Sequence, residues 1–105
     1  EPMANMALYE KAREDGKLSG YGLAVLGALL VPSEKFELSQ VRREVVATQK
    51  LANEMRLPRK AVLLGLRELV SSPYIDAATV TGTQRRYFTF EARLLTDAET
   101  LAVVS

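Results

Sequence analysis

The stretch TQKLANEMRLPRKAVLLGLRELV (48–70) constrains the fold of this chain more than any other, because two short helical patterns meet in it with almost no connection between them. Thr48 is a good N-cap for the first pattern, whose apolar residues follow at the spacing of a single buried stripe. Pro58 suits the first position of the second helix, because an N–H at that position has no acceptor within the helix and proline loses no hydrogen bond there. The sequence therefore predicts helices over about 48–56 and 58–71 that form a compact corner.

Caps, turns and hydrophobic periodicity predict the elements on either side of this corner. They are a short helix over about 3–15, an apolar core helix over 20–31, a short strand at Val45 and Val46, a β-hairpin over about 74–91 and a final helix over about 96–104 with Thr96 as its N-cap. No internal repeat or linker-like stretch divides the 105 residues. We therefore expect a single domain, 1–105, of the α+β class, mostly α, with its core at about 20–91.

Cysteine and histidine are both absent, and this limits the chemistry that the chain can perform. Without them there is no disulfide framework, no common zinc site and no Ser-His or Cys-His arrangement. We therefore expect no enzyme, no cofactor and no metal. The longest apolar run, 20–31, is shorter than the roughly 20 residues that cross a bilayer, and the first residues show no signal-peptide pattern. A cytoplasmic protein without membrane contact is expected.

Basic residues are concentrated in the middle of the sequence, although the formal net charge is only +1. From Arg42 to Arg93 there are ten Lys and Arg residues against five acids, whereas the segments on either side each carry a charge of −2. The helical corner lies inside this basic segment. The segment is either a solvated surface that is basic by chance or a surface for a polyanionic partner.

The corner contains, in order, Thr48, then Leu51 and Ala52, the turn at Leu57 and Pro58, the basic pair Arg59 and Lys60, and the core residues Val62, Leu66 and Leu69. The hairpin contains GTQRRYFTF (82–90), with a glycine, a basic pair and an aromatic strand. These residues resemble those of winged helix-turn-helix DNA-binding proteins, of the small bacterial, phage or plasmid regulator type. The resemblance covers about residues 20–91. It implies a winged helix with extra N- and C-terminal helices.

The resemblance also implies a function: sequence-specific binding of double-stranded DNA by a homodimeric transcriptional regulator or repressor. The helix over 58–71 would enter the major groove, and the wing over 74–91 would reach the backbone or the minor groove. The DNA-binding residues would be Thr48, Gln49 and Lys50 on the first helix, Arg59, Lys60 and Arg67 on the second, and Arg85 and Arg86 on the wing. Arg59 and Lys60 stand at a helix N-terminus, where free N–H groups and the helix dipole favour phosphate. Tyr87, Phe88 and Phe90 are interpreted as wing-to-core packing rather than as a base-stacking surface.

Two features depart from the family's pattern. Arg56 occupies a turn position where many members carry glycine, so the turn must use a different backbone conformation or tolerate strain. The second departure lies on the outward face of the second helix, which consists of Lys60, Leu64, Arg67 and Glu68, with Ala61 nearby. The middle of this face is therefore a leucine where a polar side chain is typical.

Leu64 has three possible explanations: contact with a thymine methyl group, an apolar protein interface, or a helix that is buried on both sides. The second explanation leads to an alternative function. In it the chain is a winged-helix protein-interaction module, or a DNA-docking component of a plasmid or phage replication or partition complex, whose protein partner contacts Leu63 and Leu64.

Overall fold

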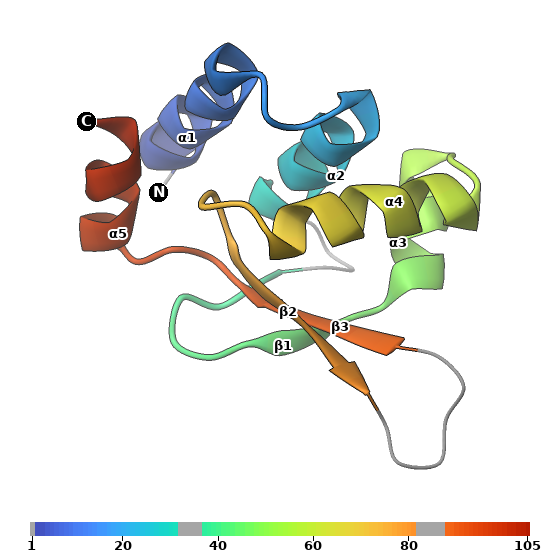
Figure 1. Ribbon diagram of the computed structural model, residues 1–105. Coiled ribbons are helices and arrows are strands. Elements are labelled where there is room, and N and C mark those ends of the chain that lie inside the picture. Colours follow the sequence, from blue (N-terminus) through green and yellow to red (C-terminus); the bar gives the residue numbers. More distant parts are fainter. Residues whose placement is uncertain (1, 32–36, 82–87) are drawn as a thin grey trace.

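The computed structural model describes residues 2–31, 37–81 and 88–105, which form five helices and three strands (Figure 1). In chain order these are α1 (Pro2–Asp15), α2 (Gly20–Leu30), β1 (Glu44–Val46), α3 (Thr48–Met55), α4 (Arg59–Val70), β2 (Asp76–Thr81), β3 (Phe88–Arg93) and α5 (Asp97–Val104). The predicted class, α+β and mostly α, is confirmed. Each predicted helix and strand is present near its predicted bounds.

The three strands form one antiparallel sheet in the order β1-β3-β2, so the last strand of the chain lies in its centre. Val46 and Thr79 flank Phe90 in the register, and because side chains alternate along a strand these residues share one face. Val46 and Phe90 are buried on that face, which confirms the core position expected for Phe90. The side chains of Tyr87 and Phe88 lie outside the described residues.

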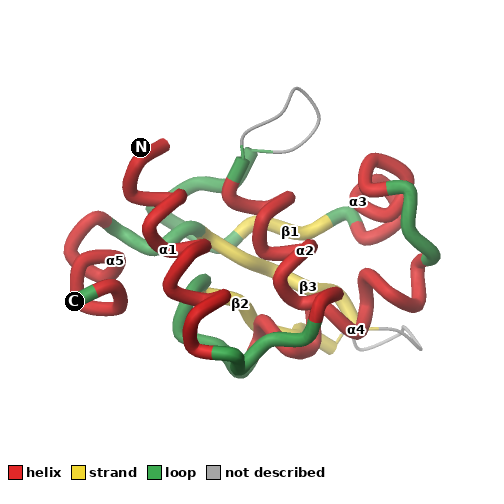
Figure 2. The backbone as a smooth tube through the Cα atoms, turned by 90° about the horizontal axis from the view of Figure 1, so that it is seen from above, coloured by secondary structure: helices red, strands yellow, loops and turns green. Residues whose placement is uncertain are grey.

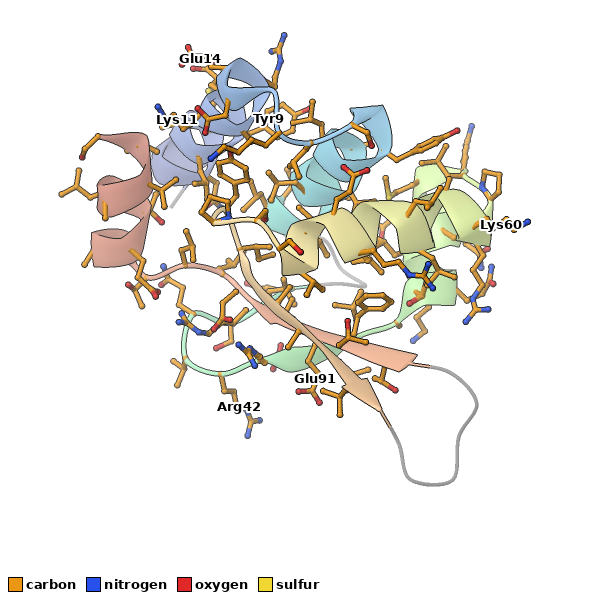
Figure 3. All side chains as sticks on the ribbon, viewed as in Figure 1. Tyr9, Lys11, Glu14, Arg42, Lys60 and Glu91 are labelled. Atoms are coloured by element: carbon orange, nitrogen blue, oxygen red, sulfur yellow. The ribbon has the colours of Figure 1, made fainter. Side chains whose placement is uncertain are left out.

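The helices cover one face of the sheet and leave the other open, as Figures 1 and 2 show from perpendicular directions. Glu91, in the middle of β3, points away from the helices (Figure 3). On the covered face α2 packs against α4, and its Val25 and Leu26 are fully buried with Val62, Leu66 and other residues of the core. α5 packs against α1 at the end of the molecule opposite to α3.

The helix ends agree with the sequence at three places. Ser19 caps α2, Thr96 and Glu99 form a complete capping box at the start of α5, and Gly16 follows α1 with a φ of 66°. The capping box satisfies two backbone N–H groups reciprocally, and glycine adopts positive φ without the clash of a Cβ. Each of these ends is defined by residues within a few positions of one another in the sequence. The sequence predicted the cap at Thr96, whereas the cap at Ser19 was not predicted.

The ends at the helical corner differ by one residue from the prediction. Ala47, not Thr48, is the N-cap of α3, and it has no side-chain cap; its carbonyl accepts from the Leu51 N–H at 2.9 Å. Pairing of β1 with β3 holds the chain extended through Val46, so the helix begins directly after the next residue. Pro58 is the N-cap of α4 rather than its first residue, and Arg59 opens the helix.

Within the described ranges no helix is both long enough and apolar enough to span a membrane.

Candidate nucleic-acid interface

α3 and α4 meet in a short turn, and each turns its apolar side towards the core. Leu51 and Ala52 of α3 are buried, and so are Val62, Leu66 and Leu69 of α4. The polar sides of both helices therefore face solvent at the same end of the molecule. Figures 1 and 2 place this end opposite to α5.

α4 packs closely against α2, and this packing fixes which side of α4 faces outward. Gly65 lies against α2, where an added Cβ would come within 2.8 Å of the carbonyl oxygen of Tyr21. Ala61 is buried on the same side, so its expected place near the outward face is wrong. The reason is that α2 covers the side of α4 on which small residues recur at a spacing of four.

Glu68 is also withdrawn from the outward face. The backbone N–H and the hydroxyl of Ser19 donate to its two carboxylate oxygens at 2.7 and 2.6 Å. Ser19 is the N-cap of α2, so this carboxylate lies at a helix N-terminus, where a negative charge is favourable. Of the residues predicted for the outward face of α4, Lys60, Leu64 and Arg67 remain, and all three are exposed.

Five basic side chains are exposed around the corner: Lys50, Arg56, Arg59, Lys60 and Arg67. Among the described residues none of the five has a carboxylate oxygen within 4.0 Å. Lys60 points away from the body of the molecule near the start of α4 (Figure 3). The corner therefore presents free positive charge to solvent.

Two other basic residues of the segment form ion pairs with acidic residues of the same chain. Arg43 lies 2.6 Å from a carboxylate oxygen of Asp76, and the Arg93 Nε lies 2.7 Å from the other. Arg93 also pairs with Glu99 at 3.0 Å. The hydrogen bond from Arg43, followed by the charges of both guanidinium groups, lowers the pKa of Asp76. The count of basic residues in the sequence thus overstates the charge that a partner would meet.

The backbone conformation of Arg56 shows how the turn forms without the glycine that is typical at this position. Its φ of 57° and ψ of 41° place it in the left-handed region, so the turn keeps the conformation typical of glycine and places arginine in it. Arg56 was not among the predicted DNA-binding residues, although its basic side chain and its position in the turn were visible in the sequence.

The remaining predicted site residues divide into three groups. Gln49 and Lys50 are exposed at the start of α3, and Gln49 donates to Asn53 at 3.0 Å, whereas Thr48 is half-buried. Arg85 and Arg86 lie outside the described residues. The ends of β2 and β3 that lead to them point towards the same end of the molecule as the α3–α4 turn (Figures 1 and 2).

The two leucines that were predicted as a protein interface differ in exposure. Leu63 is partly buried and packs against the core, whereas Leu64 is 50% exposed. A helix buried on both sides is therefore wrong as the explanation of Leu64. Contact with a thymine methyl group and contact with a protein remain as hypotheses.

No group of three or more Asp and Glu residues that could hold a metal ion is found in the described part of the chain. Comparisons of the chain with protein-family models, with curated proteins and with solved structures gave no match.

Proposed function

We propose that this chain is a winged-helix domain that binds double-stranded DNA in a sequence-specific way, as a homodimeric transcriptional regulator. The proposal rests on one observation. Five exposed basic side chains surround the corner and have no acidic partner among the described residues: Lys50, Arg56, Arg59, Lys60 and Arg67. A polyanion is the partner that such a surface attracts, through release of the counterions of its phosphates.

The order of the elements supports the winged-helix part of the proposal. A winged helix is expected to run helix, short strand, helix, turn, helix and two-stranded hairpin, and α2, β1, α3, α4, β2 and β3 follow in this order. The hairpin strands pair with β1 in one sheet. α1 and α5 would be the additional terminal helices, at the end away from the DNA.

In this proposal α4 enters the major groove with its N-terminal end. Arg59 and Lys60 open the helix, and their backbone N–H groups lie where the helix dipole attracts phosphate. Arg67 stands two turns further along the same exposed side and would reach base edges or the opposite strand. Gln49 and Lys50, at the start of α3, would contact the backbone and set the register. Arg85 and Arg86 of the wing would contact the backbone or the minor groove.

The experiment that tests the proposal is a fluorescence titration of random-sequence duplex DNA at two salt concentrations, with the mass of the protein in solution measured alongside. We expect micromolar binding that weakens steeply with salt, which is typical of non-specific contact with phosphates, by a particle of twice the chain mass. Selection of a preferred site from a random duplex pool would follow. Absence of binding at low salt would contradict the proposal.

A second candidate function is supported by one observation, the exposure of Leu64 on the outward face of α4. An exposed leucine between the basic residues Lys60 and Arg67 fits an apolar contact with another protein. The chain would then be an interaction module or a docking component of a replication or partition complex. Leu64→Glu would abolish association with the partner or with a second copy, and Arg59→Ala would do little. If the domain binds DNA instead, Arg59→Ala weakens duplex binding and Leu64→Glu leaves the mass in solution unchanged.

A further inference from the structure

Arg56 has a left-handed backbone conformation, which is unusual for arginine. It is the one non-glycine residue with positive φ in the described part of the chain, at 57°. In this region the Cβ of an L-residue crowds the backbone, and glycine, asparagine and aspartate are the residues that adopt it readily. Arginine has neither the missing Cβ of glycine nor the short polar side chain with which asparagine and aspartate bond the local backbone.

The fold nevertheless requires this conformation, because it ends α3. The N–H of Arg56 donates to the Asn53 carbonyl at 3.3 Å, and the N–H of Leu57 donates to the Ala52 carbonyl at 3.1 Å. Left-handed residues after a helix commonly satisfy its last carbonyls in this way. At the end of α1 the same chain places Gly16, with a φ of 66°. The chain thus uses glycine for one left-handed helix end and arginine for the other.

The side chain of Arg56 gives the fold nothing that offsets this strain. It is exposed, and it makes no hydrogen bond or ion pair with any residue that the structure describes. It stands three residues before Arg59, in the turn that connects α3 to α4. A residue that strains the backbone and whose side chain the fold does not use is typical of positions kept for a function.

We propose that the Arg56 guanidinium binds a backbone phosphate of the DNA beside the groove that α4 enters. This inference rests on the proposed function. A guanidinium donates two parallel N–H bonds to phosphate oxygens, and it keeps its charge at any physiological pH. Because Arg56 precedes the first residue of α4 and lies in the turn, its partner is the sugar-phosphate backbone at the rim of the groove rather than a base edge. The contact fixes the position of the corner and adds affinity for any sequence.

The test compares Arg56→Gly, Arg56→Lys and the wild type in two measurements, thermal unfolding and duplex binding over a range of salt. Arg56→Gly removes the strain and the charge together, so we expect its Tm to rise by roughly 2–6 °C. Its affinity for duplex should fall by roughly tenfold at 0.1 M salt, and the slope of log K against log salt should flatten by about 0.9, which corresponds to one lost phosphate contact. Arg56→Lys keeps the charge and the strain, and it should retain the Tm and most of the slope.

Arg13→Ala, on α1 away from the corner, is the control because it removes the same charge, and it should leave the slope unchanged. If Arg56→Gly raises the Tm and leaves the slope unchanged, Arg56 is a helix end without a DNA contact and the inference is overturned. If Arg56→Gly lowers the Tm, the side chain stabilises the fold, and the inference is overturned for that reason. A wild-type chain that binds no duplex at low salt overturns the proposed function as well, which separates the two failures.

Discussion

Gly65 of α4 lies directly against the backbone of Tyr21 in α2: a Cβ at Gly65 would come within 2.8 Å of the Tyr21 carbonyl oxygen and 2.6 Å of Cγ2 of Val25. Real Cβ atoms do not approach so closely, and the oxygen belongs to the backbone of a helix, which cannot give way like a side chain. The absence of a side chain at Gly65 therefore sets the separation of the two helices. It also sets the outward direction of Lys60, Leu64 and Arg67.

Gly65→Ala should destabilise the domain, although alanine favours a helix more than glycine does by about 1 kcal/mol. The overpacking forces α4 away from α2, and we expect a net loss of about 1–3 kcal/mol in the free energy of unfolding. Denaturation by urea, with the midpoint and the slope compared with those of the wild type, measures this.

Gly20→Ala is the matched control, because Gly20 opens α2 and a Cβ there meets nothing within 4 Å. This change should be neutral or stabilise the domain by up to about 1 kcal/mol. Equal effects of the two substitutions would mean that the helices do not approach each other as described.

Glu99 should make the stability depend on pH in the acid range. Hydrogen bonds from Arg93, followed by those from the backbone and side chain of Thr96, lower its pKa to about 2 from the usual 4.5. A carboxyl whose pKa is lower in the folded state stabilises the fold above pH 4.5, and this contribution is lost as the pH falls towards 2. The free energy of unfolding measured from pH 6 to pH 2 should decrease less steeply in Glu99→Gln than in the wild type.

Glutamine can keep the capping hydrogen bond to the Thr96 N–H, so Glu99→Gln isolates the charge. Glu54→Gln is the charge-matched comparison, because it removes an exposed carboxylate on α3 that has no ion pair in the described ranges. Identical curves for the wild type and Glu99→Gln would show that the Arg93–Glu99 pair does not persist in solution.

Tyr74 should titrate late in alkali and hold the end of α1 in place. Its side chain is fully buried, and its hydroxyl donates to Asp15 at 2.5 Å. Burial, and then the hydrogen bond to the Asp15 carboxylate, raise its pKa from 10.0 to about 12. The neutral phenol is thus the form that the fold favours, so this contribution to stability is complete below pH 10 and is lost as the pH rises through 12.

Tyr74→Phe removes the hydroxyl but keeps the ring in the core, so we expect a modest loss of about 1 kcal/mol at neutral pH. The tyrosinate absorbance of the wild type should include an ionisation step near pH 12, and this late step should be missing in Tyr74→Phe. A late step that survives the substitution would assign it to another tyrosine.

Arg59 and Lys60 should together contribute two phosphate contacts in the proposed complex. The double variant Arg59→Ala, Lys60→Ala should flatten the slope of log K against log salt by about 1.8 units. Both side chains are exposed, so the Tm should change little. The matched control, Lys11→Ala with Arg13→Ala, removes the same charge from α1. Equal losses of slope in the two double variants would indicate that net charge, rather than the corner, drives binding.

The sequence predicted most of the elements because their signals are local. Thr96 and Glu99 are three residues apart, and Gly16 has the backbone freedom that the end of α1 requires. The same local rules erred by one residue at Thr48, where the strand pairing of Val46 with Phe90, distant in sequence, sets the start of the helix. The strain at the turn was visible as an arginine where glycine was expected, but its resolution, a left-handed Arg56, needed the structure.

The candidate site was predicted less completely than the fold. Gln49, Lys50, Arg59, Lys60 and Arg67 are all exposed as expected, whereas Thr48 is half-buried. Exposure follows from helical periodicity, so these positions could be predicted. The sequence could not predict which basic residues have acidic partners, because no local pattern indicates that Asp76 pairs with both Arg43 and Arg93.

The sequence by itself determined where helices and strands form, because capping, glycine conformations and hydrophobic periodicity act over a few neighbouring residues. Only the tertiary structure decided which residues are withdrawn from the outward side of α4 and which charges remain free. Ala61 is buried, and Glu68 accepts hydrogen bonds from Ser19, 49 residues earlier in the chain. Such contacts arise from the packing of whole helices, whose relative positions depend on every residue between them.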